Sequence, residues 1–220
     1  MCFSATASFG AAALLAATGA ATLSKAKRAA ERPLAAMPLV FALQQGIEGL
    51  LWLSVPTGHP AGRALATAFA VIAMVVWPVL TPLAMGLAET NLRRKRWIMA
   101  LTGAGLGVAG YSLLDIWDHP YMARPAPHSL IYINDSPFPN LLMGAYLVAV
   151  CLPPLLSTSP ALKCFGVTVT VGLAITLGFF FFSLVSVWCF FAAIASAILV
   201  TYFYSPAKNT YAAGDYAARP

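Results

Sequence analysis

The stretch LAAMPLVFALQQGIEGLLWLSV, residues 34–55, decides the class of this protein. It runs for 22 residues and contains a single charged side chain, Glu48. A helix needs roughly 20 mainly apolar residues to cross the hydrocarbon layer of a membrane, where every backbone polar group must be paired within the segment. The stretch is therefore predicted to be a transmembrane helix.

Comparable stretches fill most of the chain. The 220 residues are 60% hydrophobic and 9% charged, with a mean hydropathy of +0.79, which the surface of a water-soluble globule would not tolerate. The segments are apolar on all sides, whereas the strands of a membrane barrel alternate apolar and polar residues. We expect an all-α transmembrane bundle in one domain, residues 1–205, followed by a flexible cytoplasmic tail, residues 206–220. Seven spans are predicted, at about 4–23, 34–55, 64–88, 97–117, 140–156, 164–182 and 184–204.

Only the total length of the last apolar region predicts that it contains two spans. Residues 179–191 contain no charge and no strong turn residue, so only the total apolar length requires a second crossing. Seven spans are favoured over six for this reason.

The basic residues fall almost entirely in alternate loops between the spans. Two of the thirteen, Arg63 and Arg124, lie in the opposite set of loops. Because cytoplasmic loops are enriched in Lys and Arg, the N-terminus is predicted to lie outside and the C-terminus in the cytoplasm. We expect a multi-pass protein of the bacterial cytoplasmic (inner) membrane, with the lipid bilayer as its main partner. This topology explains the net charge of +6, so nucleic-acid binding is not expected.

Charges within the membrane are costly and mark candidate functional sites. Glu48 shares one helix face with Phe41, Gln44, Gln45 and Trp52, because their offsets stack along one side of a helix. We expect this face to contact protein rather than lipid.

Polar residues gather on the side predicted to be outer. Asp115, one turn beyond Tyr111, is the second acidic group of the spans. The loop from Asp118 to Pro139, about twenty residues, is the longest connection, and its sequence predicts a folded cap over the bundle. A cap over a polar cleft suits the binding of a small ligand. The predicted ligand pocket comprises Cys2, Ser4, Gln44, Gln45, Glu48, Trp52, Tyr111, Asp115, His128, Ser129, Trp188 and Cys189.

Small residues and prolines predict how the helices pack. The four glycines between residues 103 and 110, and small residues such as Ser186 in the last span, would let neighbouring helices approach closely. Trp77–Pro78 and Pro82 would bend the third span.

Five motifs carry a resemblance to a known family. They are MCFSATASF at the start, QQGIEG at 44–49 followed by Trp52, Trp77–Pro78, HSLIY at 128–132 and SVWCFF at 186–191. Over nearly its whole length the chain resembles an uncharacterised bacterial family of small seven-helix integral membrane proteins that begin MCFSAxASF. The resemblance implies a shared fold but no established activity. It singles out Cys2, Ser4, Gln45, Glu48, Trp52, His128 and Cys189.

Metal binding is an alternative interpretation of the outer polar residues. Thiolate, imidazole and carboxylate suit zinc or copper, and the candidate ligands are Cys2, Glu48, His128 and Cys189. No H-x-x-x-H, C-x-x-C or H-E-x-x-H spacing supports such a site.

A disulfide between Cys2 and Cys189 is a further alternative, because both lie on the oxidising outer side. Retinal is not expected, since no span contains a lysine, and neither is haem held by two helix-borne histidines.

Three functions remain open. The first is a receptor, transporter or enzyme that binds or processes a small or lipidic molecule at an outward-facing pocket around Glu48. The second is an accessory or assembly subunit of a larger membrane complex, in which the Phe-rich face from 179 to 191 binds protein or pigment. The third is a metal-dependent membrane hydrolase. No catalytic residue is assigned; a base would be Glu48 or His128, and a thiol nucleophile Cys2 or Cys189.

Overall fold

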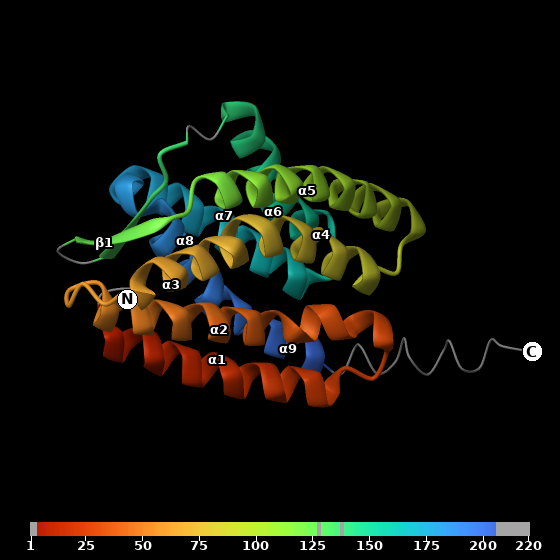
Figure 1. The fold of residues 1–220 in the computed structure, drawn as a ribbon. Helices are drawn as coiled ribbons and strands as arrows, with labels where there is room; N and C mark the ends of the chain where they lie inside the picture. Colours follow the sequence, from red (N-terminus) through yellow and green to blue (C-terminus); the bar gives the residue numbers. More distant parts are fainter. Residues whose placement is uncertain (1–3, 127–128, 137–138, 206–220) are drawn as a thin grey trace, which may run out of the picture.

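The computed structural model describes residues 4–126, 129–136 and 139–205, and it is built mainly of helices (Figure 1). Two antiparallel strands, β1 (Met122–Ala126) and β2 (Ser129–Ile133), lie between the fifth and sixth α-helices. The helices in chain order are α1 (Ala5–Lys25), η1 (Ala29–Glu31), α2 (Arg32–Ser54), α3 (Ala61–Val71), η2 (Ile72–Val76), α4 (Trp77–Ala88), α5 (Leu92–Asp118), α6 (Asn140–Leu156), α7 (Pro160–Phe179), η3 (Phe181–Ser183), α8 (Leu184–Ser196) and α9 (Ile198–Tyr204).

These elements correspond to the predicted spans. Six helical stretches of the described residues are long and apolar enough to cross a membrane, and α6 is a shorter apolar helix of 17 residues. The break between the last two spans, which the sequence placed only by length, lies at Phe180. The six longer stretches are Ala5–Lys25, Ala29–Ser54, Ala61–Ala88, Leu92–Asp118, Pro160–Phe179 and Phe181–Tyr204.

The first two helices pack closely along their length (Figure 1). An added Cβ at Gly19 would lie 2.5 Å from the side chain of Leu39, and one at Gly49 would lie 2.7 Å from the ring of Phe9. A side chain at either position would therefore force Leu39 or Phe9 to move. The outer surface of α1 is apolar, with Leu14 70% exposed, as expected for a helix that faces lipid.

The third span changes its hydrogen-bonding pattern in the middle. Its segment η2 is a π-helix that ends immediately before Trp77–Pro78. Proline has no N–H to donate to the carbonyl four residues earlier, and a π turn is one way for a helix to accommodate that loss. Across from it, an added Cβ at Gly105 of α5 would collide with the carbonyl oxygen of Pro78. Close approach of another helix is thus confirmed for Gly105, whereas Cβ atoms at the other three glycines would meet no described residue.

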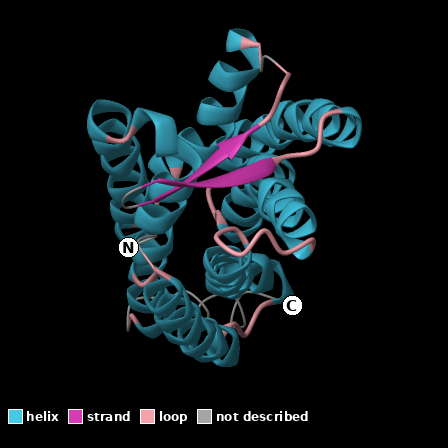
Figure 2. Ribbon diagram, turned by 60° about the vertical axis from the view of Figure 1, so that its left-hand side comes forward, coloured by secondary structure: helices cyan, strands magenta, loops and turns pink. Residues whose placement is uncertain are grey.

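The predicted cap is a two-stranded hairpin. Its strands β1 and β2 pair along their whole length and lie across the helices (Figure 2). Leu130 of β2 is fully buried, and the ring of Tyr132 stacks on Phe69 of α3 with centroids 4.4 Å apart. Since β1 packs on α3 and β2 packs on α8 and η3, the hairpin covers one end of the bundle.

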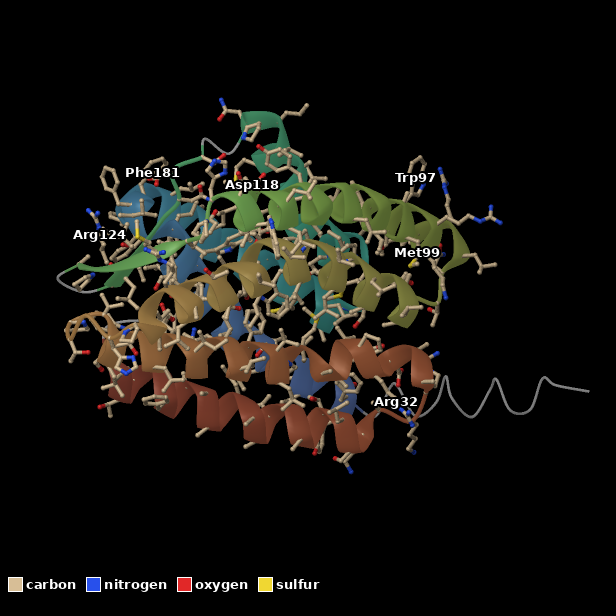
Figure 3. All side chains as sticks on the ribbon, viewed as in Figure 1. Arg32, Trp97, Met99, Asp118, Arg124 and Phe181 are labelled. Atoms are coloured by element: carbon tan, nitrogen blue, oxygen red, sulfur yellow. The ribbon has the colours of Figure 1, made fainter. Side chains whose placement is uncertain are left out.

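The two ends of the bundle differ in charge. Arg124 and Phe181 lie at the end that carries the hairpin, the hairpin end, whereas Arg32 and Trp97 lie at the opposite end (Figure 3). The described Lys and Arg residues other than Arg63 and Arg124 lie at this opposite end, the basic end. Helix α1 begins at the hairpin end and α9 ends at the basic end (Figure 1).

Candidate functional site

The face of α2 that carries Glu48 is turned into the bundle. Gln44, Gln45 and Glu48 are all 0% exposed, and Phe41 is 3% exposed. This face is buried because α2 packs against α1, α3, α4 and α8. The prediction that it contacts protein is confirmed, and Trp52, one turn further along, is partly buried.

Glu48 is held by side chains from two helices. The hydroxyl of Ser186 in α8 donates to its Oε1 at 2.5 Å, and Nε2 of Gln45 donates to its Oε2 at 3.2 Å. The sequence had assigned Ser186 a role in close packing, but its hydroxyl also binds the acid. A carboxyl group thus joins α2 to the first turn of α8.

Gln44 links three helices one turn deeper in the bundle. Its Oε1 accepts from Nε1 of Trp77 in α4 at 2.8 Å, and its Nε2 donates to the sulfur of Cys189 in α8 at 3.2 Å. Trp77 also stacks on Phe41, with ring centroids 3.9 Å apart. We call Gln44, Gln45, Glu48, Trp77, Ser186 and Cys189 together the Glu48 cluster.

A small cavity lies beside the deeper half of this cluster. The space open to the centre of a water molecule is about 20 Å³, which is enough for about one water. Its walls include the rings of Phe41, Trp77, Tyr146 and Trp188, together with Cys189. The hydroxyl of Tyr146 donates to the carbonyl of Ala73 at 2.8 Å, and Nε1 of Trp188 donates to the carbonyl of Val169 at 3.1 Å. These bonds fix the two rings, so the cavity is a largely apolar space with a thiol in its wall.

Three buried polar atoms in the hairpin-end half of α1 and α2 have no hydrogen-bond partner among the described residues. They are Oγ of Ser8, Oε1 of Gln45 and Nε1 of Trp52. Gln45 and Trp52 are seven residues apart and so lie on the same side of α2. Ser8 lies at a similar level, because its neighbour Phe9 contacts Gly49. The hairpin-end half of α1 and α2 thus contains donors and acceptors that bond to no described residue.

Asp115 belongs to a different cluster. Its carboxylate lies 3.4 Å from Nδ1 of His119 and accepts from Nδ2 of Asn134 at 3.1 Å. Burial raises the pKa of the nearby Tyr121 phenol, the Asp115 carboxylate raises it further, and a hydrogen bond with Asn134 opposes both effects. Helix α5, which carries Asp115 and Tyr111, packs on α4 and α6. The described partners of Asp115, His119 and Asn134, are not members of the Glu48 cluster.

The remaining predicted pocket residues are dispersed. Ser4 is exposed and caps α1 by accepting from the backbone N–H of Ala7. Ser129 of β2 shares a 2.6 Å hydrogen bond with Ser183, one turn before Ser186, and so ties the hairpin to the start of α8. Cys2 and His128 lie outside the described residues.

The metal and disulfide alternatives gain no support. Within the described residues, no group of three or more His, Cys, Asp and Glu side chains could hold a metal ion. Cys189 is a free thiol, so the structure does not contain the considered disulfide with Cys2. Two of the four proposed metal ligands, Cys2 and His128, lie outside the described residues.

Sequence reasoning missed the partners that complete the cluster. Trp77 was considered for its effect on helix shape, and Tyr146 was not singled out. One signal was available for Ser186, since it lies three residues before Cys189 and therefore on the same helix face. No local pattern indicated that Trp77 would meet Gln44, because the two side chains come from different spans.

The apolar surfaces, the span lengths and the buried polar cluster define a multi-pass helical membrane protein. The chain belongs to DUF6629, a family of unknown function whose model matches residues 1–213. Comparisons with curated proteins and with solved structures give no match.

Proposed function

We propose that this protein binds a small or lipidic molecule in the hairpin-end half of the bundle, at a pocket around Glu48. We further propose that it lies in the bacterial inner membrane with the hairpin end outside. The positive-inside rule supports this orientation, because the basic residues concentrate at the other end.

The observation that carries the proposal is the set of three buried polar atoms, on Ser8, Gln45 and Trp52, that bond to no described residue. Native proteins leave few such atoms, and each one costs about 1–3 kcal/mol when it is buried without a partner. A bound molecule that offers both a donor and an acceptor would satisfy them. Gln45 also contacts the carboxyl group of Glu48, which would add a further polar contact.

The surroundings indicate the chemistry of this molecule. The Gln45 oxygen needs a donor, and the Trp52 N–H needs an acceptor, so a hydroxyl or amide group suits both. The rings of Phe41 and Trp77 favour an attached apolar part. Since the cavity in this structure admits about one water, binding requires the hairpin or a neighbouring helix to move. The Ser129–Ser183 hydrogen bond would couple such a movement of the hairpin to α8.

Removing the partnerless atoms tests the proposal. In a structural cluster, Trp52→Phe and Ser8→Ala would leave stability unchanged or raise it, because each deletes a buried polar atom that bonds to no described residue. In a ligand site, the same variants and Glu48→Gln would lose a compound that copurifies with the wild type. The measurement is mass spectrometry of organic extracts from the purified proteins, with Trp97→Phe at the basic end as the control. Equal extracts from all variants, or no compound above the detergent blank, would reject the proposal.

The accessory-subunit alternative has one supporting observation. Phe179, Phe181 and Phe182, at the turn between α7 and α8, are 80%, 65% and 82% exposed. Such a patch suits contact with another membrane protein or with lipid. Crosslinking in native membranes followed by copurification separates this function from ligand binding.

A further inference from the structure

A second hollow lies on the surface of the bundle, and no member of the Glu48 cluster lines it. It is an open groove of about 660 Å³ at the hairpin end, between α3 and the end of α5. The groove is lined by Pro60, Arg63, Ala64, Thr67, Ala68, Val71, Leu113, Ile116, Trp117 and Pro120.

Side-chain size explains the shape of the groove. One face of α3 carries only small or medium side chains at helical spacing, from Ala64, Thr67, Ala68 and Val71. These side chains protrude little from the helix, so this face forms the floor of the groove. The opposite wall is higher because α5 contributes larger side chains, including Trp117. The result is a trough with a small-residue floor and bulky apolar walls.

The groove is long enough to follow the upper part of an acyl chain in the hydrocarbon layer. From Arg63 to Val71 the floor descends roughly 12 Å along the helix axis, at 1.5 Å per residue. One leaflet contributes about 15 Å of hydrocarbon, so the groove has the depth of the upper part of an acyl chain. Trp117 is 85% exposed near the end of α5, where an aromatic residue of a membrane protein commonly meets the headgroup region. At this position a protein that spans the membrane would meet phospholipid.

A single charge stands at the mouth of the groove. Arg63 is the one ionisable residue of its lining, in the first turn of α3. Its guanidinium makes no hydrogen bond or ion pair with the described residues. Arginine presents a planar fork of donors that matches phosphate. The mouth of the groove is thus complementary to a phosphate group, and its interior to an acyl chain.

We propose that the groove binds a glycerophospholipid of the outer leaflet, with its phosphate on Arg63 and an acyl chain along Ala64 to Val71. This site is separate from the proposed pocket around Glu48, so either can be rejected without the other. Arg124 provides a matched comparison, because it is also basic and at the hairpin end but lies on β1 and does not line the groove.

The experiment uses the full-length protein, delipidated in detergent, with dioleoyl phosphatidylglycerol as the probe and native mass spectrometry as the readout. We expect Arg63→Gln to weaken retention of this lipid roughly tenfold, since it removes a charge-assisted hydrogen bond to phosphate. Arg124→Gln should leave retention unchanged. Ala64→Phe should also weaken retention by filling the floor, whereas Ala104→Phe, at an exposed position of α5 outside the groove, should not.

Two further probes separate the headgroup from the chain. Dioleoylglycerol lacks the phosphate, so its retention should be weak and insensitive to Arg63→Gln. Glycerol 3-phosphate lacks the chains and should not compete with the phospholipid at equal concentration. Competition by glycerol 3-phosphate would reveal a simple phosphate site and overturn the proposal. Equal loss of phospholipid in Arg63→Gln and Arg124→Gln, or no loss in Ala64→Phe, would also overturn it, provided that thermal unfolding shows each variant to be folded.

Discussion

Two buried glutamates, one at each end of the molecule, show how a carboxyl group serves different purposes. At the basic end, Glu89 follows α4 and is 4% exposed. It accepts five hydrogen bonds, from the backbone of Thr90 and Asn91, the hydroxyl of Ser157, and both the backbone and the hydroxyl of Thr158. These bonds fasten the end of α4 to the connection between α6 and α7.

The Glu48 cluster is built differently. Glu48 also accepts from a hydroxyl and from a side-chain amide, but buried atoms of Ser8, Gln45 and Trp52 nearby bond to no described residue. A cluster in which every polar atom is hydrogen-bonded stabilises one structure. A cluster with unused atoms keeps capacity for a bound molecule. The five hydrogen bonds of Glu89 therefore indicate a structural role, and the polar atoms of Ser8, Gln45 and Trp52 that bond to no described residue support a binding role for Glu48.

The largest effect is expected from Glu89→Ala. We expect it to lower the free energy of unfolding by about 3 kcal/mol, because several donors lose their acceptor in a buried site. Denaturant unfolding in detergent measures the change. The control is Asp118→Asn, which removes an exposed carboxyl at the hairpin end. Equal stability of Glu89→Ala and wild type would remove the distinction between the two glutamates.

A smaller loss of stability is expected from Gln44→Leu. It leaves Nε1 of Trp77 buried without its acceptor, at a cost of about 2 kcal/mol. Adding Trp77→Phe removes the stranded donor, so the double variant should be more stable than the sum of the two single losses implies. If the losses of the two single variants add up to that of the double variant in the same unfolding assay, the hydrogen bond between Gln44 and Trp77 contributes no coupling energy.

The smallest effect is expected in the pH dependence of stability. Burial raises the pKa of Glu89, but hydrogen bonds from Asn91, Thr158 and Ser157 outweigh it, so the pKa lies below its ordinary value of 4.5. Ionised Glu89 therefore contributes stability that is fully present above pH 4.5 and is lost as the pH falls through the lower folded-state value. The difference in melting temperature between wild type and Glu89→Gln should shrink below pH 4.5. A constant difference from pH 7 to pH 3 would contradict it.

The sequence predicted those features that depend on local pattern. Span positions follow from apolar length, and the buried face of α2 follows from the helical spacing of Phe41, Gln44 and Glu48. The folded cap was indicated by SLIYI at 129–133, which forms β2.

The sequence could not predict how side chains from distant spans combine. Trp77 meets Gln44 because α4 packs against α2, and nothing near either residue encodes that pairing. Asp115 contacts His119, one turn later at the end of the same helix, and Asn134 beyond β2, and the second of these contacts joins segments 19 residues apart. The π-helix before Trp77–Pro78 was likewise beyond local reasoning, since a proline permits several distortions and packing selects one.

The short helix α6 also determines what kind of bilayer suits this protein. Its 17 residues rise only about 25 Å, against roughly 30 Å of hydrocarbon in a typical membrane. Leu141 in its first turn is 85% exposed, which leaves this helix open to contact with lipid tails. We therefore expect hydrophobic mismatch at α6 to thin the surrounding leaflets and to favour shorter-chain lipids.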